Sequence, residues 1–190
     1  MKKMQLLIIL SSILVLTHAQ VPFLGPCPEM KTMENFDVSQ YMGKWYEAER
    51  YFDISEFGGR CVNSNYTDGA NVSIKLIHQQ TSSLTGTVSK VQGEVIKAEK
   101  TYFPAKMVIK FPYLPGDAPY WVLDTDYVNY SVVWSCSDFG ILSTRNAWIL
   151  TRERNPSIET MENAYRTIDK NFISRAFFIR TDQTNCQEDN

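Results

Sequence analysis

Four cysteines carry the most distinctive chemistry of this 190-residue sequence, at positions 27, 61, 136 and 186. No two of them are spaced as Cys-x-x-Cys, the arrangement common in zinc sites. After residue 19 the chain holds one histidine, His78, so nitrogen ligands for a metal are equally scarce. An even number of thiols predicts two disulfides in an oxidising compartment, and spacing alone leaves three pairings open. We therefore expect no metal site.

The same residues limit the catalysis that the sequence can support. If all four thiols are paired, no thiolate remains as a nucleophile, and with one histidine no Ser-His-Asp combination can be read. His78 could instead ligate a haem iron or hydrogen-bond a bilin, because a neutral imidazole is a common ligand. It could equally be a polar residue of a binding pocket. We expect a binding protein rather than an enzyme.

The N-terminus predicts the compartment. Lys2 and Lys3 precede an apolar run over residues 6–16, and small residues follow at positions 17 and 19. This order is typical of a secretory signal peptide, and the apolar run is too short to cross a bilayer. We expect residues 1–19 to be removed and residues 20–190 to form one secreted, extracellular domain.

The charges of the chain are nearly balanced. The sequence has 19 basic and 21 acidic residues, a formal net charge of −2. Lysine and arginine are not clustered, so a nucleic-acid surface is not expected.

Three Asn-x-Ser/Thr sequons, at Asn65, Asn71 and Asn129, are acceptors for N-glycans in a secreted chain.

Most of the chain reads as short strands divided by turn residues such as Asp68-Gly69 and the segment 112–119. Eight strands at this spacing favour a closed antiparallel barrel or a sandwich. The ranges that the pattern predicts are 43–52, 60–67, 72–79, 86–95, 106–111, 119–126, 130–136 and 145–152.

One helix follows the strands. Asn155 is a good N-cap and Pro156 suits the first helical position. Apolar residues then recur at helical spacing and predict a face that packs on the outside of the sheet: Ile158, Met161, Ala164, Tyr165 and Ile168. A last short strand is expected over residues 177–181.

Alternation along the strands predicts which side chains point inward. The lysines at 75, 106 and 110 should face water, which turns their neighbours inward. Trp148 shares the face of Arg152. The inward set is apolar and aromatic with a few polar groups, as in ligand pockets. Its predicted members are Tyr66, Ile74, His78, Met107, Ile109, Phe111, Val133 and Trp148.

Three motifs resemble the signatures of lipocalins. Gly43-Lys44-Trp45-Tyr46 opens the first strand, Thr125-Asp126-Tyr127 follows the sixth, and the segment 148–152 ends in Arg152 on the eighth. They occur in the order and at the spacing of that family. The resemblance implies an all-β fold, an eight-stranded antiparallel up-and-down β-barrel with one C-terminal α-helix packed outside.

The resemblance also implies structural roles. Trp45 would lie at the closed base of the barrel beneath Arg152, where a cation–π contact is worth roughly 0.5–2 kcal/mol. Gly43, Trp45 and Arg152 would then be structural rather than ligand-binding.

Within the family, the segments 35–38, 59–61, 118–121 and 147–150 resemble the apolipoprotein D-like subgroup, with the insect bilin-binding lipocalins as near relatives. This subgroup implies the disulfides Cys27–Cys136 and Cys61–Cys186. It implies a carrier of a small hydrophobic ligand such as a fatty acid, sterol or retinoid. The alternatives are a bilin- or haem-binding lipocalin, or a lipocalin-type isomerase, which uses a free cavity cysteine.

Four loops should surround the open end of such a barrel, at 51–60, 80–85, 112–118 and 137–144. They carry apolar residues such as Phe57, Phe139 and Ile141. Exposed apolar side chains gathered at one end suggest contact with a membrane or lipoprotein surface. The same side chains could instead fold down and cap the cavity.

Overall fold

The structure is a computed structural model that describes residues 21–69, 73–97, 104–112 and 116–187. None of the helices within these ranges is both long enough and apolar enough to span a bilayer. The expected signal peptide, residues 1–19, lies outside the described residues.

Eight antiparallel strands, β2 to β9, form a closed barrel, and this confirms the predicted fold class. Each strand pairs with the next along the chain, and the pairing of β9 with β2 completes the circle. The barrel strands are β2 (Gly43–Tyr51), β3 (Gly59–Asp68), β4 (Ile74–Ser82), β5 (Val88–Lys97), β6 (Lys106–Lys110), β7 (Ala118–Thr125), β8 (Tyr130–Asp138) and β9 (Leu142–Thr151).

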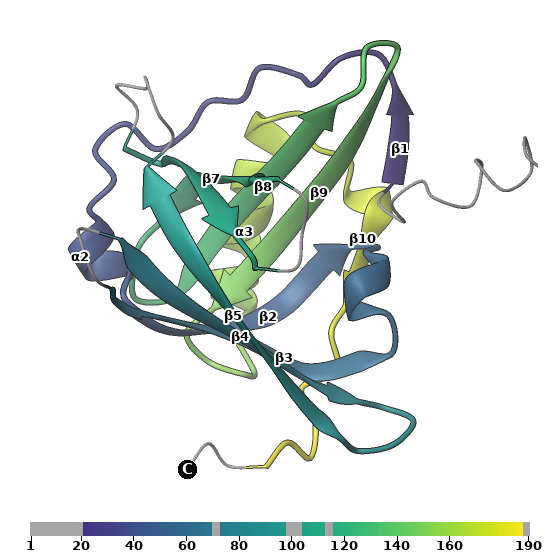
Figure 1. Cartoon of the computed structure of the whole chain (residues 1–190). Coiled ribbons are helices and arrows are strands. Elements are labelled where there is room, and N and C mark those ends of the chain that lie inside the picture. Colours follow the sequence, from purple (N-terminus) through teal and green to yellow (C-terminus); the bar gives the residue numbers. More distant parts are fainter. Residues whose placement is uncertain (1–20, 70–72, 98–103, 113–115, 188–190) are drawn as a thin grey trace, which may run out of the picture.

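Two short strands extend the sheet beyond the barrel (Figure 1). β1 (Val21–Leu24) pairs with the first residues of β9, and the sequence pattern does not predict it. β10 (Phe178–Arg180) pairs with β2, within the expected range 177–181. The short elements also include a single helical turn, α2 (Val38–Tyr41), and two 3-10 turns, η2 (Ile54–Glu56) and η3 (Arg175–Phe177).

The main helix, α3 (Ile158–Lys170), packs against the outer face of β7 and β8. Its N-cap is Ser157, whose Oγ accepts a hydrogen bond from the Thr160 N–H at 3.1 Å, so the predicted cap Asn155 is wrong. A serine oxygen satisfies a free N–H of the first turn as well as asparagine does, and the helix begins two residues later than expected.

Two apolar clusters lie on opposite sides of the barrel wall. The inner cluster fills the barrel interior around Trp45, Tyr66 and Val133. The outer cluster lies between the wall and α3, whose Ala164 and Ile168 are fully buried. Ile158, predicted to belong to the packed face, is 81% exposed because it lies in the first turn, beyond the sheet contact.

Arg152 closes the base of the barrel. Its guanidinium carbon lies 3.7 Å from the ring centroid of Trp45, which is completely buried. The guanidinium also donates to the carbonyl oxygens of Tyr127 (2.9 Å) and Lys44 (2.8 Å). Gly43 lies beside it with φ +92°, a conformation that side chains disfavour, and an added Cβ would stand 3.4 Å from Arg152 Nη1.

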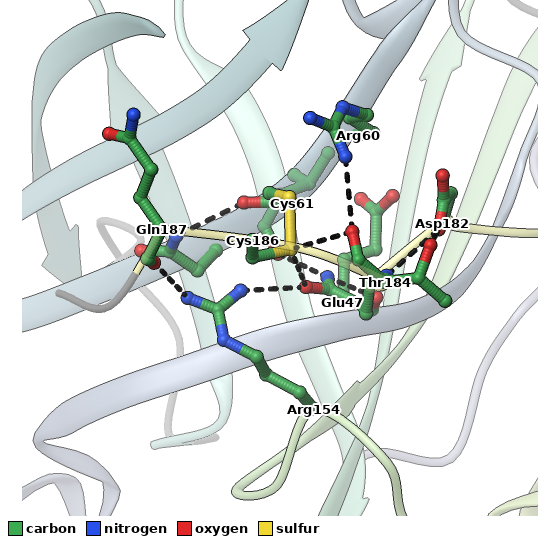
Figure 2. Close-up of a disulfide and its surroundings, with 11 residues drawn as sticks. Glu47, Arg60, Cys61, Arg154, Asp182, Thr184, Cys186 and Gln187 are labelled. Carbon is green, nitrogen blue, oxygen red and sulfur yellow. Dashed lines mark hydrogen bonds between the residues drawn. A yellow bond between two sulfur atoms is a disulfide. The ribbon is translucent and has the colours of Figure 1, made fainter. Parts of the chain in front are cut away.

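Two disulfides join the terminal segments to the wall: Cys27–Cys136 and Cys61–Cys186, the pairing that the resemblance implies. Figure 2 shows the second with Arg60 on one side and Arg154 on the other. Arg60 donates to the Thr184 carbonyl at 3.0 Å, and Arg154 donates to Gln183 Oε1 at 3.0 Å. The segment 181–187 is therefore bound across the outside of the barrel.

Replacing Arg152 by Met should lower the free energy of unfolding by about 3 kcal/mol, because partly buried carbonyl oxygens lose a charged donor and Trp45 loses its cation–π partner. Urea denaturation followed by circular dichroism measures the change. Arg166→Met is the matched control, since Arg166 lies on the exposed face of α3 in a weak ion pair with Glu162. It should change stability by less than about 0.5 kcal/mol. Equal effects of the two substitutions would contradict a closing role for Arg152.

Candidate functional site

The barrel encloses a cavity of about 350 Å³ that opens at the end opposite Trp45. Six of the eight predicted pocket residues line it: Tyr66, His78, Ile109, Phe111, Val133 and Trp148. They lie on or directly after five different strands, so closure of the sheet is what brings them together.

Ile74 and Met107 are the exceptions among the predicted pocket residues. Both belong to the inner cluster, and Met107 is 2% exposed, but neither lines the cavity. They lie at the base end of β4 and β6, where Trp45 and its neighbours fill the interior. Both side chains thus belong to the inner cluster, below the reach of the cavity.

A chain of tyrosine hydroxyls forms the floor of the cavity. Tyr120 Oη lies 2.7 Å from Tyr66 Oη and 2.9 Å from Tyr41 Oη, which in turn lies 3.0 Å from Ser131 Oγ. Burial raises the pKa of Tyr41 to about 12 and the pKa values of Tyr66 and Tyr120 well above their usual range. The floor is therefore a neutral hydrogen-bonded network.

Two aromatic rings give the cavity an apolar surface. Trp148 from β9 and Phe111, just after β6, are half-buried and line it. The ring of Phe111 lies over Gly93, where an added Cβ would stand 2.8 Å from Phe111 Cε1. A side chain at position 93 would displace this ring, so the glycine makes room for it.

The cavity also has a polar wall, which was not predicted. Arg50 Nε lies 3.1 Å from Glu47 Oε1 and 2.6 Å from Glu56 Oε2, and all three side chains are buried. Glu47 and Glu56 line the cavity, whereas Arg50 lies behind them. A bulge between Glu47 and Glu49 turns the strand so that both Glu47 and Arg50 reach this cluster.

His78 joins this polar wall to the neighbouring strand. Its Nδ1 lies 3.1 Å from Ser64 Oγ, and its Nε2 lies 3.6 Å from Glu56 Oε1. Nearer the mouth, Asp53 accepts a hydrogen bond from Asn146 Nδ2 at 2.8 Å. Each of these side chains lines the cavity.

The C-terminal segment holds Glu47 from outside. The Thr181 hydroxyl donates to Glu47 Oε1, and Gln183 Nε2 donates to the Glu47 carbonyl oxygen at 2.9 Å. Burial, the charge of Glu56 and a hydrogen bond with the Glu56 side chain raise the pKa of Glu47 well above its ordinary range, although Arg50 and Thr181 act in the opposite direction.

The mouth carries exposed apolar side chains on three loops. Phe57 is 72% exposed, Leu84 92% and Ile141 82%. Ile54 both lines the cavity entrance and is half exposed. These residues do not fold down over the cavity, which decides against the capping alternative for them.

Two of the three sequons lie in the described residues, both toward the closed end in the strand order. Asn65 is partly exposed on β3, and Asn129 is exposed in the turn between β7 and β8, where its amide donates to Asp126 Oδ2 at 2.7 Å. Asn71 lies outside the described residues.

Residues 42–185 match the lipocalin / cytosolic fatty-acid binding protein family, and the chain therefore belongs to that family. The resemblance to the apolipoprotein D-like subgroup is confirmed as well. Apolipoprotein D of Oryctolagus cuniculus is 37% identical over 94% of each chain. The Lazarillo protein of Schistocerca americana is 32% identical and covers 83% of this chain and 75% of its own. The structure of insecticyanin from Manduca sexta superposes with a TM-score of 0.77 at 24% identity, covering 88% and 91% of the two chains.

Glu47→Gln should flatten the dependence of stability on pH. The pKa of Glu47 is raised in the folded state above its ordinary value of 4.5, so the folded chain binds a proton that the unfolded chain has lost. Stability therefore falls as the pH rises above 4.5, by up to about 1.4 kcal/mol per pH unit, and a glutamine removes this loss.

Urea unfolding at a series of pH values between acidic and mildly alkaline conditions measures this difference. Glu94→Gln, on the exposed face of β5, is the matched control and should keep the wild-type profile. Parallel profiles for wild type and Glu47→Gln would show that Glu47 is ionised in the folded protein.

Proposed function

We propose that this protein is a secreted carrier that binds one small hydrophobic ligand, of the class of fatty acids, sterols, retinoids and similar lipids, in its barrel cavity. The observation that carries the proposal is the cavity itself, which is walled by Trp148 and Phe111 and closed at the base. Burial of an apolar ligand surface of ~300 Å² gives a gross driving force of ~7 kcal/mol before entropy losses. Micromolar binding is therefore within reach.

The proposal includes the compartment and the mature chain. Two disulfides fit an extracellular protein. In this proposal residues 1–19 are a signal peptide and residues 20–190 are a single mature domain. Glycans on Asn65 and Asn129 would lie near the closed end and leave the mouth free, and Asn71 is proposed as a third acceptor.

Catalysis is the first alternative, because Ser64, His78 and Glu56 lie in a row that resembles a hydrolytic triad. The backbone around Ser64 argues against it. Ser64 lies within β3, between β2 and β4, so its neighbouring N–H groups belong to the strand ladders and cannot form an oxyanion hole. The isomerase alternative needs a free thiol, and all four cysteines are in disulfides. A carrier is the better proposal.

A bilin- or haem-binding lipocalin is the second alternative. As an axial haem ligand, His78 would need a free ring nitrogen facing the cavity. Both of its ring nitrogens face side-chain oxygens, of Ser64 and Glu56. The histidine therefore does not fit the haem role, and the proposal keeps it as a polar residue of the cavity wall.

Trp148→Ala should weaken binding of the best hydrophobic ligand about thirtyfold, since loss of an aromatic anchor costs ~2 kcal/mol or more. Titration of fatty acids, retinoids and sterols, followed by tryptophan fluorescence, measures the dissociation constant. In the wild type the ligand should change the emission of Trp148 and leave Trp45, buried at the base, nearly unaffected.

Trp121→Ala is the control for this experiment, because Trp121 packs against the outer cluster beneath Lys106 rather than in the cavity. It should bind the ligand as wild type does. If Trp148→Ala also binds as tightly as wild type while folded, the ligand does not occupy this cavity. If no hydrophobic compound binds, the carrier function is wrong.

We further propose that the mouth contacts a neutral lipid surface. The exposed side chains Phe57, Leu84 and Ile141 come from three different loops at one end of the barrel. Apolar groups gathered in this way mark an interaction surface more often than chance exposure does. Ligand could then pass between the lipid and the cavity without crossing water.

Replacing Phe57 and Ile141 by Ser should reduce binding to phosphatidylcholine vesicles at least about tenfold, because two apolar side chains no longer enter the lipid. Vesicle flotation measures the bound fraction. The matched control replaces Phe172 and Ile158 by Ser. These two apolar side chains are exposed like Phe57 and Ile141 (Ile158 is 81% exposed and Ile141 82%), but they do not belong to the mouth loops. Equal vesicle binding by the two double variants would show that the mouth is not the contact surface.

A further inference from the structure

Apart from His78, the ionisable side chains of the cavity wall discussed above are acidic. The lining includes three carboxyl groups, on Glu47, Asp53 and Glu56, and among the described residues it includes no lysine or arginine. Each of the three is at least nine-tenths buried. A free carboxylate that entered the cavity would meet acidic groups and find no lining lysine or arginine to pair with.

Arg50 does not offer a partner for a carboxylate in the cavity, because it already binds the acidic side chains of the wall. Arg50 lies behind the wall, its Nε is in contact with both Glu47 and Glu56, and its Nη2 donates to the Glu56 carbonyl oxygen at 2.9 Å. It is 4% exposed. The wall thus holds three carboxyl groups against one guanidinium, which contacts Glu47 and Glu56 and leaves the acidic groups in excess.

Independently of these charges, the wall contains a hydrogen-bond acceptor that has no donor, the side-chain oxygen of Asn146. Asn146 is 4% exposed, and it lies on β9 two residues before Trp148, so both side chains point into the barrel. Its Nδ2 must face Asp53, because a carboxylate only accepts hydrogen bonds. The other amide atom, Oδ1, is therefore turned away from Asp53, and it is buried without a partner. A buried acceptor of this kind costs free energy until a donor reaches it.

We propose that the ligand carries a hydrogen-bond-donating, positively charged amine at its polar end, which binds between Asp53, Glu56 and Asn146. The hydrocarbon part then lies against Trp148 and Phe111. An ammonium group has three N–H donors and no acceptor, so it matches a wall of carboxylate and amide oxygens. This inference rests on the carrier function and departs from the ligand class given above, because it names an amphipathic amine in place of a fatty acid, sterol or retinoid.

The test compares three ligands that share one hydrocarbon chain: octylamine, octanol and octanoate. Isothermal titration calorimetry at neutral pH should give the order amine, then alcohol, then carboxylate. The amine should bind at least about tenfold tighter than the alcohol, the scale of one hydrogen bond to a charged group. Octanoate that binds as tightly as octanol would overturn the inference.

Two variants locate the amine. Asp53→Asn keeps an oxygen acceptor for Ser55, which Asp53 caps, and Glu56→Gln removes the second charge. Each should reduce the advantage of octylamine over octanol severalfold and leave octanol binding unchanged, whereas the exposed control Glu94→Gln should change neither. An unchanged amine advantage in both variants would overturn the assigned site.

The outcomes separate this inference from the carrier function on which it rests. If none of the three ligands binds but a neutral retinoid or sterol does, the carrier function stands and the amine site is wrong. If no hydrophobic compound of any kind binds, the carrier function itself fails.

Discussion

The pairing of β9 with β2 is the constraint on which the rest of the structure depends. A sheet of eight strands has two edges, and joining them removes both and encloses an interior. Arg152 lies at this seam and binds carbonyl oxygens from Tyr127 and Lys44, which belong to parts of the chain far apart in sequence. Because the same guanidinium covers Trp45, the seam and the base of the cavity are stabilised by one side chain.

Closure also brings apolar and polar surfaces into one interior. The end of β6 and β9 supply the rings of Phe111 and Trp148. Across the seam, β2 supplies Glu47 and Arg50 from a bulged strand in which Arg50 pairs with Trp148, and their charges are tolerable in the interior only because they are paired. The C-terminal segment, held by Cys61–Cys186, supplies the Thr181 hydroxyl that also binds Glu47. A group outside the barrel thus helps to fix one inside it.

The sequence predicted the strands and most of the apolar wall because alternation is a local property. Alternation indicates that Trp148, Phe111 and Val133 face inward, and they line the cavity. It carries no information about depth along the barrel, and so it does not separate them from Ile74 and Met107, which lie below the cavity. The polar wall was missed for a different reason. Glu47 lies two residues after Trp45, so alternation along the strand would have placed both side chains on the inward face. Alternation cannot place Arg50, because the bulge after Glu47 redirects it. The meeting of Asp53 with Asn146 depends on how a loop folds across 93 residues of sequence separation, which no local pattern encodes.

The order in which the chain is synthesised has consequences for its biogenesis. The first barrel strand ends at Tyr51 and its partner in the seam ends at Thr151, so an emerging chain cannot close the barrel until nearly all of it has been made. The Cys61–Cys186 bond spans 125 positions, so it can form only after Cys186 has been synthesised, later than the seam strand. Until then both sheet edges and the apolar interior are open to other chains, the state in which β-proteins aggregate. Yield from a cell should therefore depend on chaperones and disulfide-forming enzymes more than on the stability of the finished fold.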